Sequence, residues 1–184
     1  MRKIVFVTSQ GGKAKEAQGI FGKGFLIEQL NVDLDEIQAI EGKDVVKHKA
    51  EEAFRIIKKP VIVEDTSLYF EAWRGLPGAL VRWFLKTVGC GGICKMLNRE
   101  KNRKAIAESA IAFCNGKTTK VVLGRAKGSV PQRPRGKFGF GWDPIFIPQG
   151  FKKTFAEMTV QEKNQISMRK IALEKLRKFL VKIN

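Results

Sequence analysis

Short apolar runs separated by amphipathic segments are the dominant pattern along this sequence. Ile4–Val7, Phe25–Val32 and Val61–Val63 are rich in β-favouring residues, which predicts strands. Lys13–Phe21 follows the first run, and Asp44–Ile57 precedes the third with apolar residues at helical spacing. Because strands alternate with helices, the first third of the chain predicts an α/β architecture.

The pattern changes in the second half of the chain. Ala105–Cys114 and Val121–Val130 predict two long strands, and the Asn-Gly pair between them is a strong hairpin signal. Further elements are predicted at Val81–Thr87 (helix), Gly92–Leu97 (helix), Ile145–Pro148 (strand) and Ser167–Lys182 (helix). No linker or repeat interrupts the chain. We therefore expect one α/β domain over residues 1–184, with a mixed sheet and two lobes around a cleft.

The third apolar run stops abruptly at polar residues. Glu64 and Asp65 follow it, and then the hydroxyl residues Thr66 and Ser67. We expect the strand to end at the two acids, because acids in mid-strand are costly to bury, whereas a strand's carboxyl end can face a ligand crevice. Glu64 and Asp65 are therefore our candidate reaction centre. The alternative is a strand that ends in ordinary solvated acids.

Composition adds a large positive charge. The 184 residues carry a formal net charge of +17, which indicates a polyanionic ligand, nucleic-acid binding or a lysine-rich surface. The basic residues are spread along the chain without an RGG tract or RNP-like motif, so charge alone does not decide among these. The apolar runs are shorter than the roughly 20 residues that a membrane span needs. We expect a cytoplasmic protein without a membrane partner.

Cysteine and histidine give little support for a metal site or for nucleophilic catalysis. Cys90, Cys94 and Cys114 lack zinc-type spacing, and His48 is the only histidine. His48 lies beside Lys49 among charged residues, on what is predicted to be a solvated helix face. We do not expect it to be a catalyst.

A candidate anion site follows the first predicted strand. Thr8–Lys13 combines a glycine-containing turn with a helix start, where free N–H groups and the helix dipole favour phosphate, and Lys13 adds a cation. The segment is not a Walker A loop, because Val7 and Ala14 occupy positions that need glycine and a hydroxyl residue.

Four segments, in order, resemble the motifs of the inosine/xanthosine triphosphate pyrophosphatase family. Thr8–Lys13 resembles T-G-N-x-x-K, and Glu64–Leu68, followed by Gly75–Gly78, resembles E-D-S-G-L. Phe140–Phe146 resembles F-G-Y-D-P-[IV]-F, and Phe155–Arg169 resembles F-A-E-[ML] … E-K-N-x-[IL]-S-H-R. The resemblance implies hydrolysis of non-standard purine nucleoside triphosphates to monophosphate and pyrophosphate with Mg²⁺. It also implies an elongated fold with a deep cleft, and a homodimer.

The resemblance assigns roles to individual residues. Asp65 is implied to be the general base and a metal ligand, and Glu36 the second metal ligand. The residues implied to bind the nucleotide are Thr8, Ser9, Gln10, Lys13, Thr66, Phe140, Gly141, Trp142, Asp143, Lys163, Met168 and Arg169. These roles suit the chemistry, because magnesium bridges carboxylates to phosphates and lysines offset phosphate charge. One of the two aromatic residues is expected to stack on the base and the other to belong to the core.

Four positions depart from the family pattern. Gln10 replaces asparagine, Thr66 replaces serine, Ser67 replaces glycine and Met168 replaces histidine. Ser67 would be strained if the chain turned there with a positive φ. Met168 cannot donate a hydrogen bond to a 6-oxo purine, so base selectivity is expected to change. Two alternatives stay open: a nucleic-acid-binding protein that uses the charge, and a relative that binds nucleotide without turnover.

Overall fold

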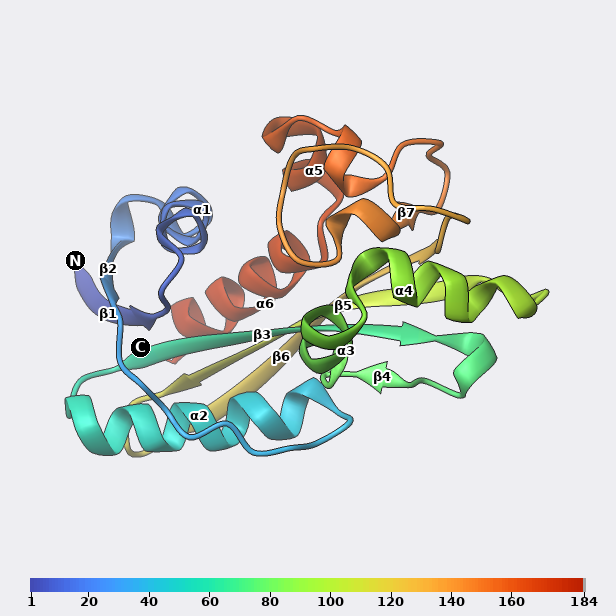
Figure 1. Cartoon of the computed structure of the whole chain (residues 1–184). Helices are drawn as coiled ribbons and strands as arrows, with labels where there is room; N and C mark the ends of the chain where they lie inside the picture. Colours follow the sequence, from blue (N-terminus) through green and yellow to red (C-terminus); the bar gives the residue numbers. More distant parts are fainter. Residues whose placement is uncertain (184) are drawn as a thin grey trace.

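The computed structural model describes residues 1–183, in which a seven-stranded mixed sheet is the central element (Figure 1). Its strands are β1 (Arg2–Val7), β2 (Phe25–Leu30), β3 (Val61–Phe70), β4 (Pro77–Gly78), β5 (Lys104–Cys114), β6 (Thr119–Ser129) and β7 (Ile147–Pro148). The strand order is β2-β1-β3-β5-β6-β7, and β4 pairs with β3. β1 is parallel to β2 and β3, and the other neighbouring pairs are antiparallel. The α/β half and the hairpin half thus form one mixed sheet, as predicted.

Helices cover both faces of this sheet. They are α1 (Gly11–Phe21), α2 (Gly42–Ile57), α3 (Val81–Thr87), α4 (Gly89–Met96), α5 (Val160–Ile166) and α6 (Met168–Lys182). α2 packs on one face, and α1 and α6 lie together on the other (Figure 1). The amphipathic pattern explains this placement, because α2 buries Val45, Val46, Ala50 and Ala53 on one stripe while its charged residues face outward.

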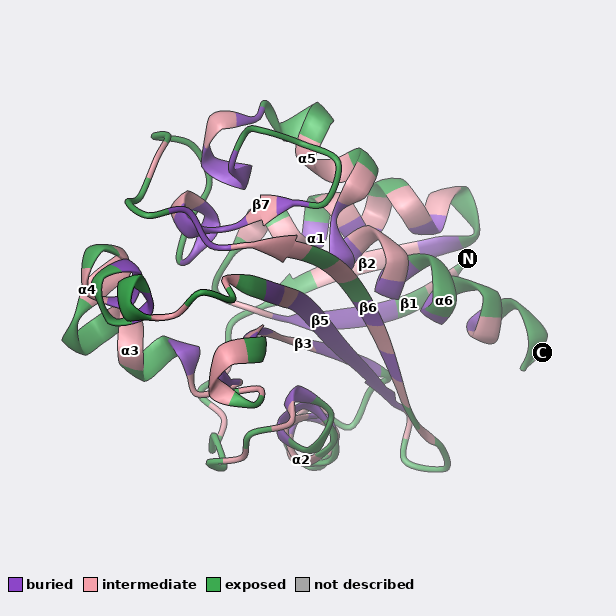
Figure 2. Cartoon of the chain, turned by 90° about the vertical axis from the view of Figure 1, so that its right-hand side faces the viewer, coloured by how far each residue is buried: buried purple, intermediate pink, exposed green. Residues whose placement is uncertain are grey.

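Buried side chains form one core on each side of the sheet and a third core in a second lobe. α2 closes the first core over Val61 and Val63, and α1 and α6 close the second over Ile62. The third core gathers residues from β3, α4 and the segment after β6, including Trp142 and Phe146. Figure 2 shows that β3 and β5 are buried along most of their length, which makes them the common support of both lobes.

The prediction that the strand from Val61 ends at the acids is wrong. β3 continues to Phe70, so Glu64 and Asp65 lie in the middle of a ten-residue strand. All ten residues pair with β5 on one edge, from Val61 opposite Cys114 to Phe70 opposite Ala105. Ser67 is likewise in extended strand rather than at a positive-φ turn, so its Cβ causes no backbone strain.

Smaller differences concern element ends. The first helix begins at Gly11 rather than Lys13, and the short helix expected from Gly92 begins at Gly89. The strand expected over Ile145–Pro148 is reduced to two residues, because Asp143–Ile145 forms a 3₁₀ turn. The predicted hairpin between β5 and β6 is confirmed.

Candidate active site

The edge of β3 that faces away from β5 is open in its middle. β1 pairs with β3 at Val61 and Ile62, and β4 pairs with it at Leu68 and Tyr69. Within residues 1–183, no strand pairs with β3 on this edge between those two points. Because this part of the β3 edge has no neighbouring strand among the described residues, residues in the middle of β3 can reach a ligand. The two acids lie at the gap between β1 and β4, in the middle of the strand rather than at its end.

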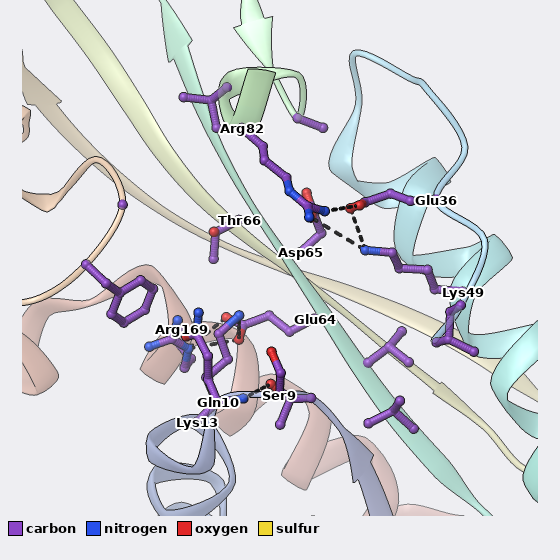
Figure 3. Close-up of a pocket in the computed structure, with 18 of the residues that line it drawn as sticks. Ser9, Gln10, Lys13, Glu36, Lys49, Glu64, Asp65, Thr66, Arg82 and Arg169 are labelled. Atoms are coloured by element: carbon purple, nitrogen blue, oxygen red, sulfur yellow. Dashed lines mark hydrogen bonds and ion pairs between the residues drawn. The ribbon is translucent and has the colours of Figure 1, made fainter. Parts of the chain in front are cut away.

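One cavity of about 510 Å³ occupies this gap. Every residue predicted for the site lines it: Thr8, Ser9, Gln10, Lys13, Glu36, Asp65, Thr66, Phe140, Gly141, Trp142, Asp143, Lys163, Met168 and Arg169. The tertiary structure therefore brings together segments from both ends of the sequence. Because successive side chains of a strand point to opposite faces, Glu64 and Asp65 enter the cavity region from opposite sides of β3 (Figure 3).

Asp65 lies on the α2 face beside a second acid. Lys49 on α2 contacts both carboxylates, with its Nζ 2.6 Å from Glu36 Oε1 and 4.0 Å from Asp65 Oδ1. Arg82 on α3 donates to the other oxygen of Glu36 (Figure 3). Burial raises the pKa of Asp65 to about 6, and the nearby Glu36 charge adds to this while Lys49 opposes it. Asp65 Oδ2 is buried and has no hydrogen-bond partner among residues 1–183.

Glu64 lies on the opposite face, where α1 and α6 pack, and its environment is different. Arg169 Nε donates to both carboxylate oxygens at 2.8 and 3.0 Å, and Ser109 Oγ donates at 2.7 Å. Lys13 Nζ lies 3.2 Å away. Burial alone would raise the pKa of Glu64, but the charges of Arg169 and Lys13 lower it to about 2. Glu64 is therefore ionised and fully paired, in contrast to Asp65.

The second lobe contributes a braced loop. Asp143 is buried, and its Oδ2 accepts from the Phe140 N–H at 2.9 Å and from Lys163 Nζ. Two cations lie close to the ring of Phe140, with Lys163 Nζ at 5.0 Å and Arg169 Cζ at 5.7 Å from its centroid. A Cβ on Gly139 would meet the Asp143 carboxylate at 2.1 Å, which requires glycine there. Asp143 thus holds this loop and Lys163 in place.

The two candidate aromatic residues have different surroundings. Trp142 is 5% exposed, and its ring packs against Phe146 and Phe155 at 5.8 and 6.4 Å between centroids. Phe140 is 45% exposed at the edge of the cavity. Trp142 is therefore the core residue of the pair, and Phe140 is available for stacking. Met168 is buried at the start of α6 and adds an apolar surface to the cavity.

The turn from Thr8 to Lys13 has the expected form of an anion site. β1 ends at Val7, and the N–H of Gln10 donates to Thr8 Oγ1 at 3.1 Å. The Gln10 side chain makes no capping hydrogen bond to α1. Gln10 therefore remains free to contact a ligand, and Lys13 lies one helical turn further on, between this turn and Glu64.

Sequence reasoning missed two cations of the site. Lys49 was assigned to a solvated helix face, but its side chain is only 16% exposed and lies over Glu36 and Asp65. Arg82 was not singled out because its short helix carries no motif. The available signal was helical spacing: Lys49 lies three and four residues from the buried Val46, Val45 and Ala53, at the edge of the stripe that packs on the sheet.

The two acids on the α2 face suit a hard divalent cation. A buried carboxylate oxygen without a partner, Asp65 Oδ2, is an unsatisfied acceptor in a cavity that also contains the Glu36 carboxylate. Residues 1–183 contain no cluster of three or more His, Cys, Asp or Glu side chains arranged to hold a metal. Magnesium is usually bound by one or two carboxylates together with water and substrate phosphates, and Glu36 and Asp65 are two such carboxylates in one cavity.

An open strand edge with two acids, flanked by lysines and arginines from several helices, defines a cleft for a polyanion accompanied by a divalent cation. The chain belongs to the Ham1 family, which it matches over residues 4–179. A Thermococcus kodakarensis protein named dITP/XTP pyrophosphatase is 42% identical over 179 residues, covering 97% of each chain. A Yarrowia lipolytica inosine triphosphate pyrophosphatase is 42% identical over 181 residues, covering 96% of this chain and 95% of the relative.

Solved structures agree with the fold over the whole chain. A HAM1 protein from Coxiella burnetii superposes with a TM-score of 0.88 at 26% identity, covering 98% of this chain and 99% of that one. The Staphylococcus aureus Ham1 protein gives a TM-score of 0.84 at 25% identity, covering both chains completely. The α/β fold with a mixed sheet, predicted from sequence, is confirmed.

Proposed function

We propose that this protein hydrolyses non-canonical purine nucleoside triphosphates, such as ITP, XTP and their deoxy forms, to nucleoside monophosphate and pyrophosphate. The observation that carries the proposal is the buried, unpartnered Asp65 carboxylate oxygen beside Glu36, in a cavity surrounded by cations. Family membership and the names of relatives that are 42% identical over nearly the whole chain support it.

Asp65 is the proposed general base. Its pKa of about 6 is high enough for the carboxylate to accept a proton from water and low enough for it to be ionised at neutral pH. Oδ2 has no partner to displace, so it can orient a water molecule toward the α-phosphorus. Attack at that phosphorus releases pyrophosphate, and the proton of the water passes to Asp65.

Glu36 and Asp65 are the proposed ligands of Mg²⁺. A bound magnesium ion would acidify the attacking water and neutralise charge on the phosphates. Lys49 contacts both acids in the structure, so we propose that it moves from the acids to the phosphates when the nucleotide and the ion bind. The pKa of Glu36 is lowered, because the hydrogen bonds and charges of Lys49 and Arg82 outweigh the effect of its burial. Glu36 is thus kept ionised for its role.

Cations around the cavity hold the triphosphate. The turn formed by Thr8, Ser9 and Gln10 offers N–H and hydroxyl groups at the start of α1, and Lys13 adds its charge. Lys49 and Arg82 face this turn across the open edge of β3 (Figure 3). These cations can offset several charges of the substrate, which is the electrostatic arrangement that stabilises charge in a transition state.

The base is proposed to bind between Phe140 and the apolar surface of Met168. Phe140 provides an exposed ring for stacking, and Gly141 and Trp142 follow it in the loop that Asp143 braces. Met168 supplies no hydrogen-bond donor, so selection of a 6-oxo purine falls to backbone N–H groups, Lys163 or Arg169. Arg169 is already shared between two carboxylates, which leaves it little freedom to contact the base.

Pyrophosphate release from a panel of nucleoside triphosphates, with and without Mg²⁺, tests the proposal directly. We expect ITP and XTP to be preferred over ATP and GTP, and we expect Asp65→Asn to abolish the signal. Equal release by wild type and Asp65→Asn would contradict the assignment. Nucleotide binding without release of product would instead support the alternative that this protein binds nucleotides but does not hydrolyse them.

We further propose that the chain acts as a single-domain homodimer in the cytoplasm. Residues 1–183 contain no helix long and apolar enough to cross a membrane. Exposed apolar side chains, including Trp83, Val88 and Met96, offer contact area for a second copy. Light scattering of the purified protein would give twice the monomer mass of 20.7 kDa if the dimer forms.

A further inference from the structure

Glu64 is the most completely paired acid next to the proposed reaction centre, yet the proposed mechanism gives it no role. Its side chain is 1% exposed. Its two oxygens share the Nε–H of Arg169, one of them also accepts from Ser109 Oγ, and the carboxylate forms an ion pair with Lys13. No oxygen of Glu64 is free to bind a metal or to take a proton from water. Any part that Glu64 plays in the reaction therefore acts through the groups that it holds.

The two cations bound to Glu64 come from distant parts of the chain. Lys13 is on α1, directly after the proposed phosphate-binding turn, and Arg169 is on α6, beside Met168 and the ring of Phe140. Both also line the cavity. Arg169 is in turn held by Glu16 on α1 at 3.2 Å. A buried carboxylate on β3 thus fixes one cation at the phosphate end and one at the base end of the same cavity.

We propose that Glu64 is a positioning residue, which holds Lys13 and Arg169 in the orientation that the bound nucleotide requires. The proposal rests on the proposed function. Long lysine and arginine side chains have many rotamers, and their ordering costs free energy at the moment of binding unless a partner fixes them beforehand. Because Glu64 orders both side chains when the chain folds, this free energy is not lost when the nucleotide binds. Ser109, from β5, holds the carboxylate itself in place.

This role differs from that of the neighbouring Asp65. Glu64 acts through two other side chains, whereas Asp65, which also lines the cavity, has a carboxylate oxygen without a hydrogen-bond partner among residues 1–183. Replacement of Glu64 by glutamine keeps the shape and removes the charge. Lys13 and Arg169 then lose their common partner, and misplacement of such groups by about 1 Å is enough to cost roughly 10²-fold in rate.

A double-mutant cycle tests the proposal. We expect kcat/KM for ITP to fall about 10²-fold in Glu64→Gln, and Glu64→Asp, which keeps the charge, to recover part of the loss. If Glu64 acts through Lys13, the loss in the Lys13→Met, Glu64→Gln double variant is smaller than the product of the two single losses. The proposal is overturned if the loss of kcat/KM in the double variant equals the product of the two single losses. It is also overturned if Glu64→Gln keeps full activity.

The matched control is Glu174→Gln. Glu174 is on α6, like Arg169, but it is half exposed and pairs only with Lys170 at 3.9 Å. The substitution makes the same chemical change away from the cavity, and we expect activity within about twofold of wild type because exposed ion pairs contribute little. A loss in Glu174→Gln equal to that in Glu64→Gln would show that net charge, not positioning, is responsible.

A second measurement separates failure of this proposal from failure of the proposed function. The same cycle is run on the Kd for tripolyphosphate by calorimetry, because this anion needs the cationic cavity but neither a base nor turnover. We expect the effects of Glu64→Gln and Lys13→Met on Kd to be non-additive. If wild type releases no pyrophosphate but the cycle remains non-additive, the proposed function fails and the positioning role stands. Additive effects on Kd overturn the positioning role.

Discussion

Glu64 and Asp65 are neighbours in sequence, but they lie on opposite faces of β3 in opposite chemical states. The Glu64 face provides an arginine, a lysine and a serine, so the acid there is ionised, with a pKa of about 2. The Asp65 face leaves one oxygen without a partner, and burial raises the pKa of Asp65 to about 6. An unsatisfied buried acid is costly for folding and useful for chemistry, whereas a saturated one stabilises its surroundings.

The largest expected effect is that of Asp65→Asn. A positioned general base contributes about 10²–10⁴-fold to the rate, and Asp65 is also a proposed metal ligand, so we expect turnover of ITP to fall at least 10³-fold. Stability should not fall. The pKa of Asp65 is higher in the folded chain than in the unfolded one, so its stabilising contribution is lost as pH rises through about 6. At pH 7 the ionised acid therefore disfavours folding.

Two measurements check this prediction. Steady-state pyrophosphate release gives the rate, and urea denaturation at pH 7 gives the free energy of unfolding. A variant that is inactive because it is less stable than wild type would contradict our account of Asp65.

Glu64→Gln should have the opposite effect on stability. It removes the charge of the carboxylate that Arg169 Nε contacts, and removal of one member of a buried ion pair typically costs about 3 kcal/mol or more in the free energy of unfolding. Because the pKa of Glu64 is lower in the folded chain, its contribution is present above about pH 4.5 and is lost as pH falls toward 2. Urea denaturation of both proteins at pH 7 and at pH 3 would test this. A difference that does not shrink in acid would count against the ion pair as the cause.

Glu36→Gln tests the proposal that Glu36 binds Mg²⁺ together with Asp65. We expect the Mg²⁺ concentration that gives half-maximal activity to rise about tenfold or more, as is usual when a metal site loses a supporting group. The substitution also frees Lys49 and Arg82, which both contact Glu36 in the structure. Titration of activity with MgCl₂ measures the change, with Glu174→Gln as control. An unaltered magnesium requirement would remove Glu36 from the metal site.

The pH dependence of activity should follow Asp65. Because a general base must be ionised, we expect kcat/KM to fall about tenfold per pH unit below roughly pH 6, the pKa of Asp65. In Lys49→Gln the fall of kcat/KM on the acidic side should begin at a higher pH, since Lys49 is the cation that most lowers the pKa of Asp65. Profiles of kcat/KM between pH 4.5 and 8 would show both effects. A value of kcat/KM that does not change with pH would contradict this role of Asp65. So would an acidic fall at the same pH in wild type and in Lys49→Gln.

The sequence was sufficient to predict most of the fold and a set of residues that line one cavity. Apolar periodicity placed α2 and α6, the Asn-Gly pair placed the β5–β6 hairpin, and the resemblance of four motifs selected residues that all line one cavity. It failed at the end of β3, because a strand that is polar in its middle is indistinguishable from one that stops there. It also failed at Lys49 and Arg82, whose charges appear solvated unless the position of the acids is known.

By itself, the sequence indicated that Glu64 and Asp65 would line a cleft or have charged partners, because carboxylates after a buried apolar run need one or the other. Only the tertiary structure decided which acid has which role. β1 ends early and β4 is short, so the edge of β3 is open where the acids lie. α1 and α6 bring cations to one face, and the other face leaves an oxygen of Asp65 unpaired. Lys13 and Arg169 are 51 and 105 residues from Glu64 in sequence, and such partners cannot be assigned from local pattern, since folding alone brings them together.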